Sequence, residues 1–92
     1  MNEDLKWCFA KSLAGHDKGT VYVINHIDSV YAYLSDGKNK LIDNPKKKKI
    51  KHIQIIKQKD SSIESKHKNH ISIMNEDIKR AIKIYISRNK EE

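Results

Sequence analysis

Residues 20–34, Thr-Val-Tyr-Val-Ile-Asn-His-Ile-Asp-Ser-Val-Tyr-Ala-Tyr-Leu, set the fold class of this 92-residue chain. Segments 20–25 and 30–34 are rich in β-branched and aromatic residues, which is typical of strands. Residues 26–29, His-Ile-Asp-Ser, are expected to form a short turn between them. The sequence therefore predicts two successive strands and a mainly β fold.

Three more strands are predicted on either side of this pair, over residues 7–12, 40–43 and 50–56. In the last of them Ile53 and Ile55 share one face, an alternation typical of a half-buried strand. Turn signals separate the strands: Gly15 and Gly19, Asp36-Gly37, and Asn44-Pro45. Five short strands at this spacing predict a small barrel, whose closure removes exposed sheet edges.

The rest of the chain is expected to end in one amphipathic helix. Residues 57–73 are polar, and we expect a linker there, or a short capped helical turn within it. Over residues 74–90, Asn75 is the expected N-cap, and apolar residues recur at helical spacing: Ile78, Ala81, Ile82, Tyr85 and Ile86. This stripe is expected to pack on the barrel of residues 1–56, giving one domain overall. Docking on a partner, or dimerisation, is the alternative.

The net charge of +7 comes almost entirely from one segment. Residues 38–59 hold nine lysines and one acid, whereas residues 1–37 and 60–92 balance to −2 and +1. Such a concentration attracts polyanions, whose counterions are released on binding. An A+T-rich genome can also enrich lysine, but it should spread lysine evenly along the chain. We therefore expect a polyanion partner, and we expect residues 46–49 to be a solvated basic run.

The composition argues against several classes of protein. The single cysteine, Cys8, allows no internal disulfide, so a cytoplasmic setting is expected. The longest apolar run, residues 30–34, is far shorter than the roughly 18 residues of a membrane span, and the N-terminus lacks the pattern of a secretory signal. His67 and His70 with one cysteine do not make a zinc site. We expect no enzymatic activity, cofactor, metal, membrane or small-molecule substrate.

The aromatic residues are expected to lie mostly in the core, since a small barrel needs its large side chains inside. Tyr31 and Tyr33 are the exception to consider, because alternation places them on one face. If Val30, Ala32 and Leu34 face the core, both tyrosines point outward and can stack on unpaired bases.

Residues 10–24, Ala-Lys-Ser-Leu-Ala-Gly-His-Asp-Lys-Gly-Thr-Val-Tyr-Val-Ile, resemble the KOW motif. The chain is similar to the KOW-domain RNA-binding proteins of bacteria and to the KOW-type large-subunit ribosomal proteins of archaea and eukaryotes. The resemblance continues through the Asp-Gly-Lys turn at 36–38 and the lysine run that ends in Lys-His-Ile at 51–53, so it covers about residues 7–56. It implies an SH3-like β-barrel that binds RNA, most often ribosomal RNA. His16 departs from the family, which usually has an arginine there, and neutral histidine does not bind phosphate as arginine does.

Charge and resemblance together predict a non-catalytic RNA-binding protein with ribosomal RNA as the favoured partner and ribosomal proteins as further partners. With two arginines in the chain, recognition through RNA backbone and shape is expected, rather than base readout. The predicted RNA-binding residues are Lys11, Ser12, Gly15, His16, Asp17, Lys18, Gly19, Lys38, Lys46, Lys47, Lys48, Lys49, Lys51 and His52. The alternative is a protein-interaction adaptor of the ribosome or the transcription machinery.

Two of these predictions carry their own alternatives. The loop between Gly15 and Gly19 can aim successive N–H groups at an anion, or it can be a tight connection between strands. For Asp17 we favour a structural role, in which its carboxylate folds the loop by bonding nearby N–H groups.

Overall fold

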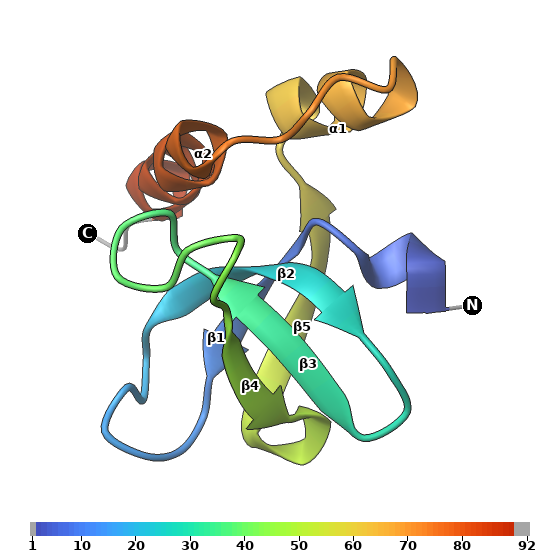
Figure 1. The fold of residues 1–92 in the computed structure, drawn as a ribbon. Coiled ribbons are helices and arrows are strands. Elements are labelled where there is room, and N and C mark those ends of the chain that lie inside the picture. The colour runs from blue at the N-terminus through green and yellow to red at the C-terminus, as the bar shows by residue number, and fades with distance from the viewer. Residues whose placement is uncertain (1, 90–92) are drawn as a thin grey trace.

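The computed structural model describes residues 2–89, which form a five-stranded antiparallel sheet and two α-helices (Figure 1). The strands are β1 (Cys8–Ser12), β2 (Val21–Ile27), β3 (Tyr31–Ser35), β4 (Lys46–Lys49) and β5 (Ile53–Lys59). The helices are α1 (Ser61–Lys68) and α2 (Asn75–Arg88), and two short 3-10 segments are η1 (Asn2–Leu5) and η2 (Ile50–His52).

The strand order across the sheet is β4-β3-β2-β1-β5, and every neighbouring pair is antiparallel. The sheet is strongly curved, and η2 connects its two edge strands at one end of the molecule (Figure 1). The mainly β fold with a C-terminal helix that the sequence predicts is confirmed.

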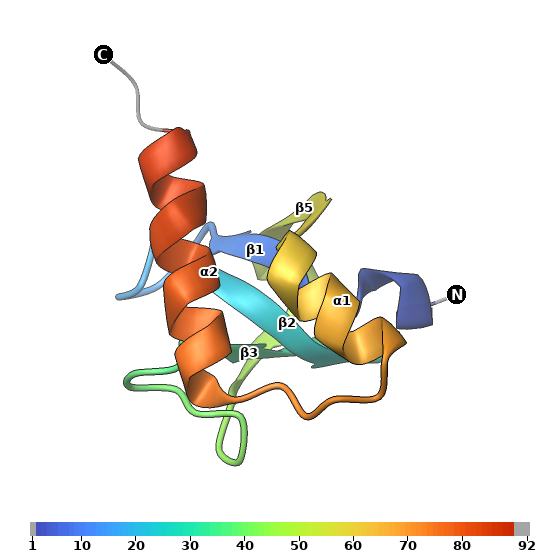
Figure 2. The ribbon, with the colours of Figure 1, turned by 90° about the horizontal axis from the view of Figure 1, so that it is seen from above.

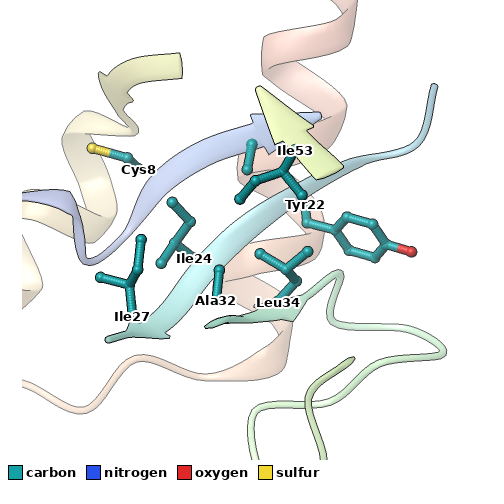
Figure 3. Packing of buried hydrophobic residues seen from close by; sticks show 8 residues of the cluster. Cys8, Tyr22, Ile24, Ile27, Ala32, Leu34 and Ile53 are labelled. Atoms are coloured by element: carbon teal, nitrogen blue, oxygen red, sulfur yellow. The ribbon is translucent and has the colours of Figure 1, made fainter. Parts of the chain in front are cut away.

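Alternate residues of the strands point into the hollow of the curved sheet and form the inner core. These side chains come from β1, β2, β3 and β5, and Figure 3 shows Ile24, Ala32 and Leu34 close together among them. The cluster consists of Cys8, Ala10, Tyr22, Ile24, Ile27, Ala32, Leu34 and Ile53. Ala32 and Leu34 are fully buried, so this face of residues 30–34, rather than the tyrosine face, is the one that enters the core. Val30, however, lies before β3 and is half exposed, so only part of its predicted face is core.

The opposite face of β1 and β2 carries a second core, which both helices cover (Figure 2). The sheet contributes Trp7, Phe9 and Val23, and the helices contribute Ile63, Ile78, Ala81 and Ile82. The ring of Phe9 stacks on that of Tyr85, with centroids 4.5 Å apart. The C-terminal helix therefore packs on the sheet, as the sequence predicts, through Ile78, Ala81 and Ile82, whereas Ile86 of the predicted stripe is half exposed.

The predicted strand over residues 40–43 is wrong. That segment makes only an isolated bridge between Leu41 and Asn44, and the fourth strand is formed by the lysine run instead. Two side chains hold the segment in its loop: Asn25 donates to the Ile42 carbonyl, and Asn75 accepts from the Ile42 amide, at 3.0 and 2.9 Å. β4 is an edge strand, and lysines are common on sheet edges because they discourage pairing with another chain.

The predicted linker is also largely wrong. β5 extends to Lys59, and α1 occupies much of the remaining segment. Its N-cap is Asp60, whose carboxylate accepts from the amide of Ile63 at 3.0 Å. Ile63 is fully buried and is the single apolar anchor of α1, so the segment shows no apolar periodicity. Lys66 then joins the helices through an ion pair with the buried Asp77, at 2.9 Å.

The start of α2 differs from its prediction in one detail. Asn75 is the first helical residue, and the carboxylate of Asp77 accepts from the Met74 amide at 2.8 Å. The side chain of Asn75 is committed to Ile42 instead. Gly37 packs directly under this helix start, because a Cβ there would overlap the Asn75 carbonyl and lie 2.9 Å from the Lys79 amide.

Candidate nucleic-acid interface

The glycine loop and the lysine strand, far apart in the sequence, meet at the carboxylate of Asp17. That carboxylate accepts hydrogen bonds from Ser12 Oγ at 2.9 Å, Tyr22 OH at 2.7 Å and Lys48 Nζ at 3.0 Å. Lys46 Nζ lies 3.5 Å from it. These five residues form what we call the polar plug, which links β1 and the β1–β2 loop to β4.

The electrostatics of the polar plug favour an ionised Asp17. Burial opposes the charge, but hydrogen bonds from Tyr22, Lys48 and Ser12 hold the pKa of Asp17 well below its usual range. Burial and the neighbouring carboxylate raise the pKa of the Tyr22 hydroxyl, so Tyr22 remains a donor. Lys48 also donates to the Ala14 carbonyl at 2.9 Å, and its side chain is only 11% exposed. Lys48 is thus occupied within the protein.

This geometry decides between the two roles of the loop residues. Asp17 has the structural role that the sequence favours, but its carboxylate bonds side chains from other elements rather than nearby amides. Gly15 and Gly19 have φ values of 89° and 91°, which glycine adopts readily. The amides of Lys18, Gly19 and Thr20 all donate to carbonyls of residues 12–17. These three amides are therefore not available to an anion, which favours a tight connection over an anion nest.

A different arrangement of groups lies on the outer surface of β2, β3 and β4. Strand alternation turns Lys47 and Lys49 away from the polar plug, toward the side that carries Tyr31, Tyr33 and His26. We call these five residues the aromatic–lysine face. Its rows follow the strand register: His26 pairs with Tyr33 and Tyr33 with Lys47, while Tyr31 pairs with Lys49.

Two pairs of side chains within the aromatic–lysine face lie close together. Lys47 Nζ lies 4.2 Å from the centroid of the Tyr31 ring, within the range of a cation–π interaction. The rings of His26 and Tyr33 have centroids 5.4 Å apart. Neither described helix lies over β3 or β4, so this surface is uncovered (Figure 1). Of the two orientations that the sequence left open, both tyrosines take the outward one, and both are half-buried there.

The turn between β2 and β3 fixes the position of Tyr31. The carboxylate of Asp28 accepts from the amides of Val30 at 2.8 Å and Tyr31 at 2.6 Å. These backbone hydrogen bonds lower the pKa of Asp28, with a further contribution from nearby His26 and Lys47. The sequence places a turn at 26–29, but β2 continues to Ile27 with a register shift between Ile24 and His26. Because of this irregularity, the sequence pattern did not identify His26 as a strand residue on the surface of the sheet.

The remaining predicted RNA-binding residues lie in two places, the first of which is the β1–β2 loop with η2. His16 and Lys18 are exposed in the β1–β2 loop, and Lys51 is exposed in η2. The His52 carbonyl accepts from the Leu13 amide at 2.9 Å, which places η2 beside the base of that loop. These residues lie at the plug end of the molecule.

Lys11 and Lys38 belong to neither the polar plug nor the aromatic–lysine face. Lys11 lines a hollow with Lys83 of α2, and Lys38 lines an adjoining one with Lys79 and Lys83. The helix lysines were not among the predicted binding residues, because the sequence gives no indication of where α2 meets the sheet. The basic residues of this chain thus occupy more than one surface.

Within residues 2–89, the structure contains no group of three or more His, Cys, Asp and Glu side chains suited to hold a metal ion. In the same residues, no helix has both the length and the apolar character needed to cross a membrane. Comparison of the chain with known proteins found no matching family model and no matching curated sequence.

Proposed function

We propose that this chain is a non-catalytic RNA-binding protein built on an SH3-like β-barrel of the KOW type, and that it binds RNA through the aromatic–lysine face. One observation carries the proposal: two outward tyrosines and two outward lysines lie side by side on uncovered strands. Stacking needs an aromatic ring with an open face, and phosphate binding needs a cation beside it. Tyr31 and Tyr33 supply the rings and Lys47 and Lys49 the cations, with the Lys47 ammonium lying over one face of the Tyr31 ring.

The chemistry of the face favours RNA with unpaired bases. An aromatic ring that stacks on a base contributes about 1–3 kcal/mol, independent of which base it is. Lys47 and Lys49 supply point charges for the phosphates, without the bidentate geometry that arginine uses to read bases. We therefore expect binding to loops or single-stranded segments with little sequence preference. Ribosomal RNA as the target rests on the KOW resemblance.

The barrel itself is supported by the strand order and by the polar plug. The order β4-β3-β2-β1-β5 places β4 and β5 at the two edges, and η2 links them. Asp17 ties β4 to the β1–β2 loop across the open end through Lys48 and Lys46. These contacts support the proposal that the curved sheet is an SH3-like barrel.

The decisive test compares two double variants of equal charge change. Lys47→Gln with Lys49→Gln removes the cations of the aromatic–lysine face, while Lys79→Gln with Lys83→Gln removes two exposed cations of α2. Binding of labelled oligouridine is measured by fluorescence anisotropy, with circular dichroism to check folding. We expect the first variant to lose affinity severalfold more than the second. Equal losses would mean that net charge alone attracts RNA, and this would contradict the proposal.

The cellular target is tested separately by crosslinking the tagged protein in its native cells and sequencing the attached RNA. Discrete sites in ribosomal RNA, with co-migration at a ribosomal subunit in a sucrose gradient, are expected. If the tagged protein is recovered with other proteins but without RNA, the result would instead support a protein-interaction adaptor.

A further inference from the structure

A groove follows α2 on the side that faces the start of β2. It consists of two adjoining hollows of about 670 and 470 Å³, which share Gly19, Val21, Lys83 and Ile86 in their walls. Figure 2 shows the helix running past the β1–β2 and β3–β4 connections, which form the opposite side of the groove. No residue of the aromatic–lysine face lines either hollow.

The floor of this groove, which we call the α2 groove, is aliphatic. Val21 and Ile82 line it beside Ile86, whose side chain is half exposed. Tyr85 lines one hollow, but its ring already stacks on Phe9. The groove therefore offers an apolar surface to an aliphatic side chain and no unoccupied aromatic ring to a nucleic-acid base.

The rim of the α2 groove is strongly basic. Its cations are Lys11, Lys38, Lys79 and Lys83. The ion pairs found among residues 2–89 involve other cations: Lys46, Lys48, Lys66 and Arg80. The one acid in the lining is Asp36, and its carboxylate accepts from the amides of residues 38, 39 and 40. The rim lysines thus have no carboxylate partner within the described residues.

We propose that the α2 groove binds an acidic protein segment that inserts an aliphatic side chain onto Val21, Ile82 and Ile86. Lys79 and Lys83 are one helical turn apart, so their ammonium groups can meet two carboxylates of one extended or helical segment. Complementary charge around an apolar centre is the usual composition of a protein interface, with its polar rim. The domain then joins RNA on one surface to protein on another, although the groove does not depend on RNA binding.

The test starts from a display library of short random peptides, panned on the full chain and counter-selected on Lys79→Glu with Lys83→Glu. We expect enrichment of peptides that combine Asp or Glu with Leu, Ile or Val. The best peptide is then titrated by fluorescence anisotropy. Two charge reversals at the rim should weaken it about tenfold or more. Ile86→Ser, at a half-exposed position, should weaken it severalfold without unfolding the domain.

The matched control reverses the same charge on the other surface, with Lys47→Glu and Lys49→Glu. This variant should keep peptide affinity while losing oligouridine affinity, and the groove variant should do the opposite. Amide shifts in NMR spectra should place the peptide at Val21, Ile82 and Ile86. The proposal is overturned if no peptide is enriched, if the enriched peptides lack acids, or if both reversals weaken peptide binding equally. If oligouridine, and not the peptide, shifts the NMR signals of the groove amides, the α2 groove binds nucleic acid instead of a protein segment.

Discussion

Lys47 and Lys48 are neighbours in one edge strand, yet they lie in different environments. The side chain of Lys48 turns inward and is held between the Asp17 carboxylate and the Ala14 carbonyl. The side chain of Lys47 turns outward over the ring of Tyr31 and is exposed. A run of four identical residues therefore divides into one pair that faces Asp17 inside the fold and one pair that is exposed on the outer surface. Residue type alone does not reveal this division, but strand alternation does.

Asp17→Ala, which removes the partner of the inward lysines, is expected to have the largest effect on stability. The change leaves the Tyr22 hydroxyl without its acceptor, and it leaves the largely buried Lys48 ammonium without a counter-ion and with the Ala14 carbonyl as its remaining acceptor. Breaking a buried, hydrogen-bonded ion pair typically costs about 3–5 kcal/mol, and we expect the free energy of unfolding to fall by about that amount. Urea denaturation measures it. A loss under about 1 kcal/mol, the range of exposed ion pairs, would show that the polar plug does not hold β4 to the β1–β2 loop.

The next largest effect should separate the two lysines directly. Lys48→Met keeps the aliphatic stem but removes a charged donor of two hydrogen bonds, so we expect a stability loss of about 1–3 kcal/mol. Lys47→Met removes an exposed charge and should change stability by about 0.5 kcal/mol. The two variants have the same composition and are compared in one set of urea titrations. Similar losses from both would refute the division of the strand.

Acid pH provides a third way to weaken the polar plug. The pKa of Asp17 is lowered by folding, so its ionised form adds stability that is complete above the unfolded-state pKa of about 4. That stability is lost as the pH falls below this value and the carboxylate protonates. The pKa values of Asp28 and Asp77 are also lowered, so the wild type should lose stability steeply in this range. Urea midpoints between pH 7 and pH 2 should fall less steeply for Asp17→Asn than for wild type.

Much of the fold could be predicted because apolar residues repeat with a clear period. The alternation in β2 and β3 and the helical spacing in α2 identify these elements from the sequence. β4 has no apolar residue. Its strand conformation follows from pairing with β3 and from the ion pair between an inward lysine and the Asp17 carboxylate. α1 has one buried residue, Ile63, and a single anchor gives no period. The sequence therefore failed to predict β4 and α1, whose conformations depend on contacts with residues distant along the chain.

The candidate site shows the same limit. The outward tyrosines followed from alternation, but their position beside Lys47 and Lys49 depended on a strand that was not predicted. Asp17 and Lys48 are 31 residues apart, and no local pattern indicates that they meet. Gly37 was predicted as a turn residue, whereas its tightest constraint is the close approach of α2. Sequence patterns identify surfaces within one hairpin more readily than contacts between distant segments.

The aromatic half of the proposed RNA-binding surface is tested by Tyr33→Leu. Leucine keeps an apolar side chain at this half-buried position but removes the ring that His26 contacts and that a base would stack on. Stacking of one base contributes about 1–3 kcal/mol, so oligouridine affinity should fall about fivefold or more at constant salt. Tyr85→Leu, on the ring that stacks on Phe9, is the matched control and should leave RNA affinity unchanged.

The smallest expected effect is a difference between Lys47 and Lys48 in the salt dependence of RNA affinity. Lys47→Gln removes one phosphate contact, so the slope of log affinity against log salt should become shallower by about 0.7 for single-stranded RNA. Lys48→Gln removes a charge that Asp17 already balances, so its slope should stay at the wild-type value under conditions where the variant is folded. Anisotropy titrations at several salt concentrations measure both slopes. A shallower slope for Lys48→Gln alone would mean that RNA displaces Asp17 from Lys48. The plug would then be part of the binding surface, and the two faces of β4 would act as one.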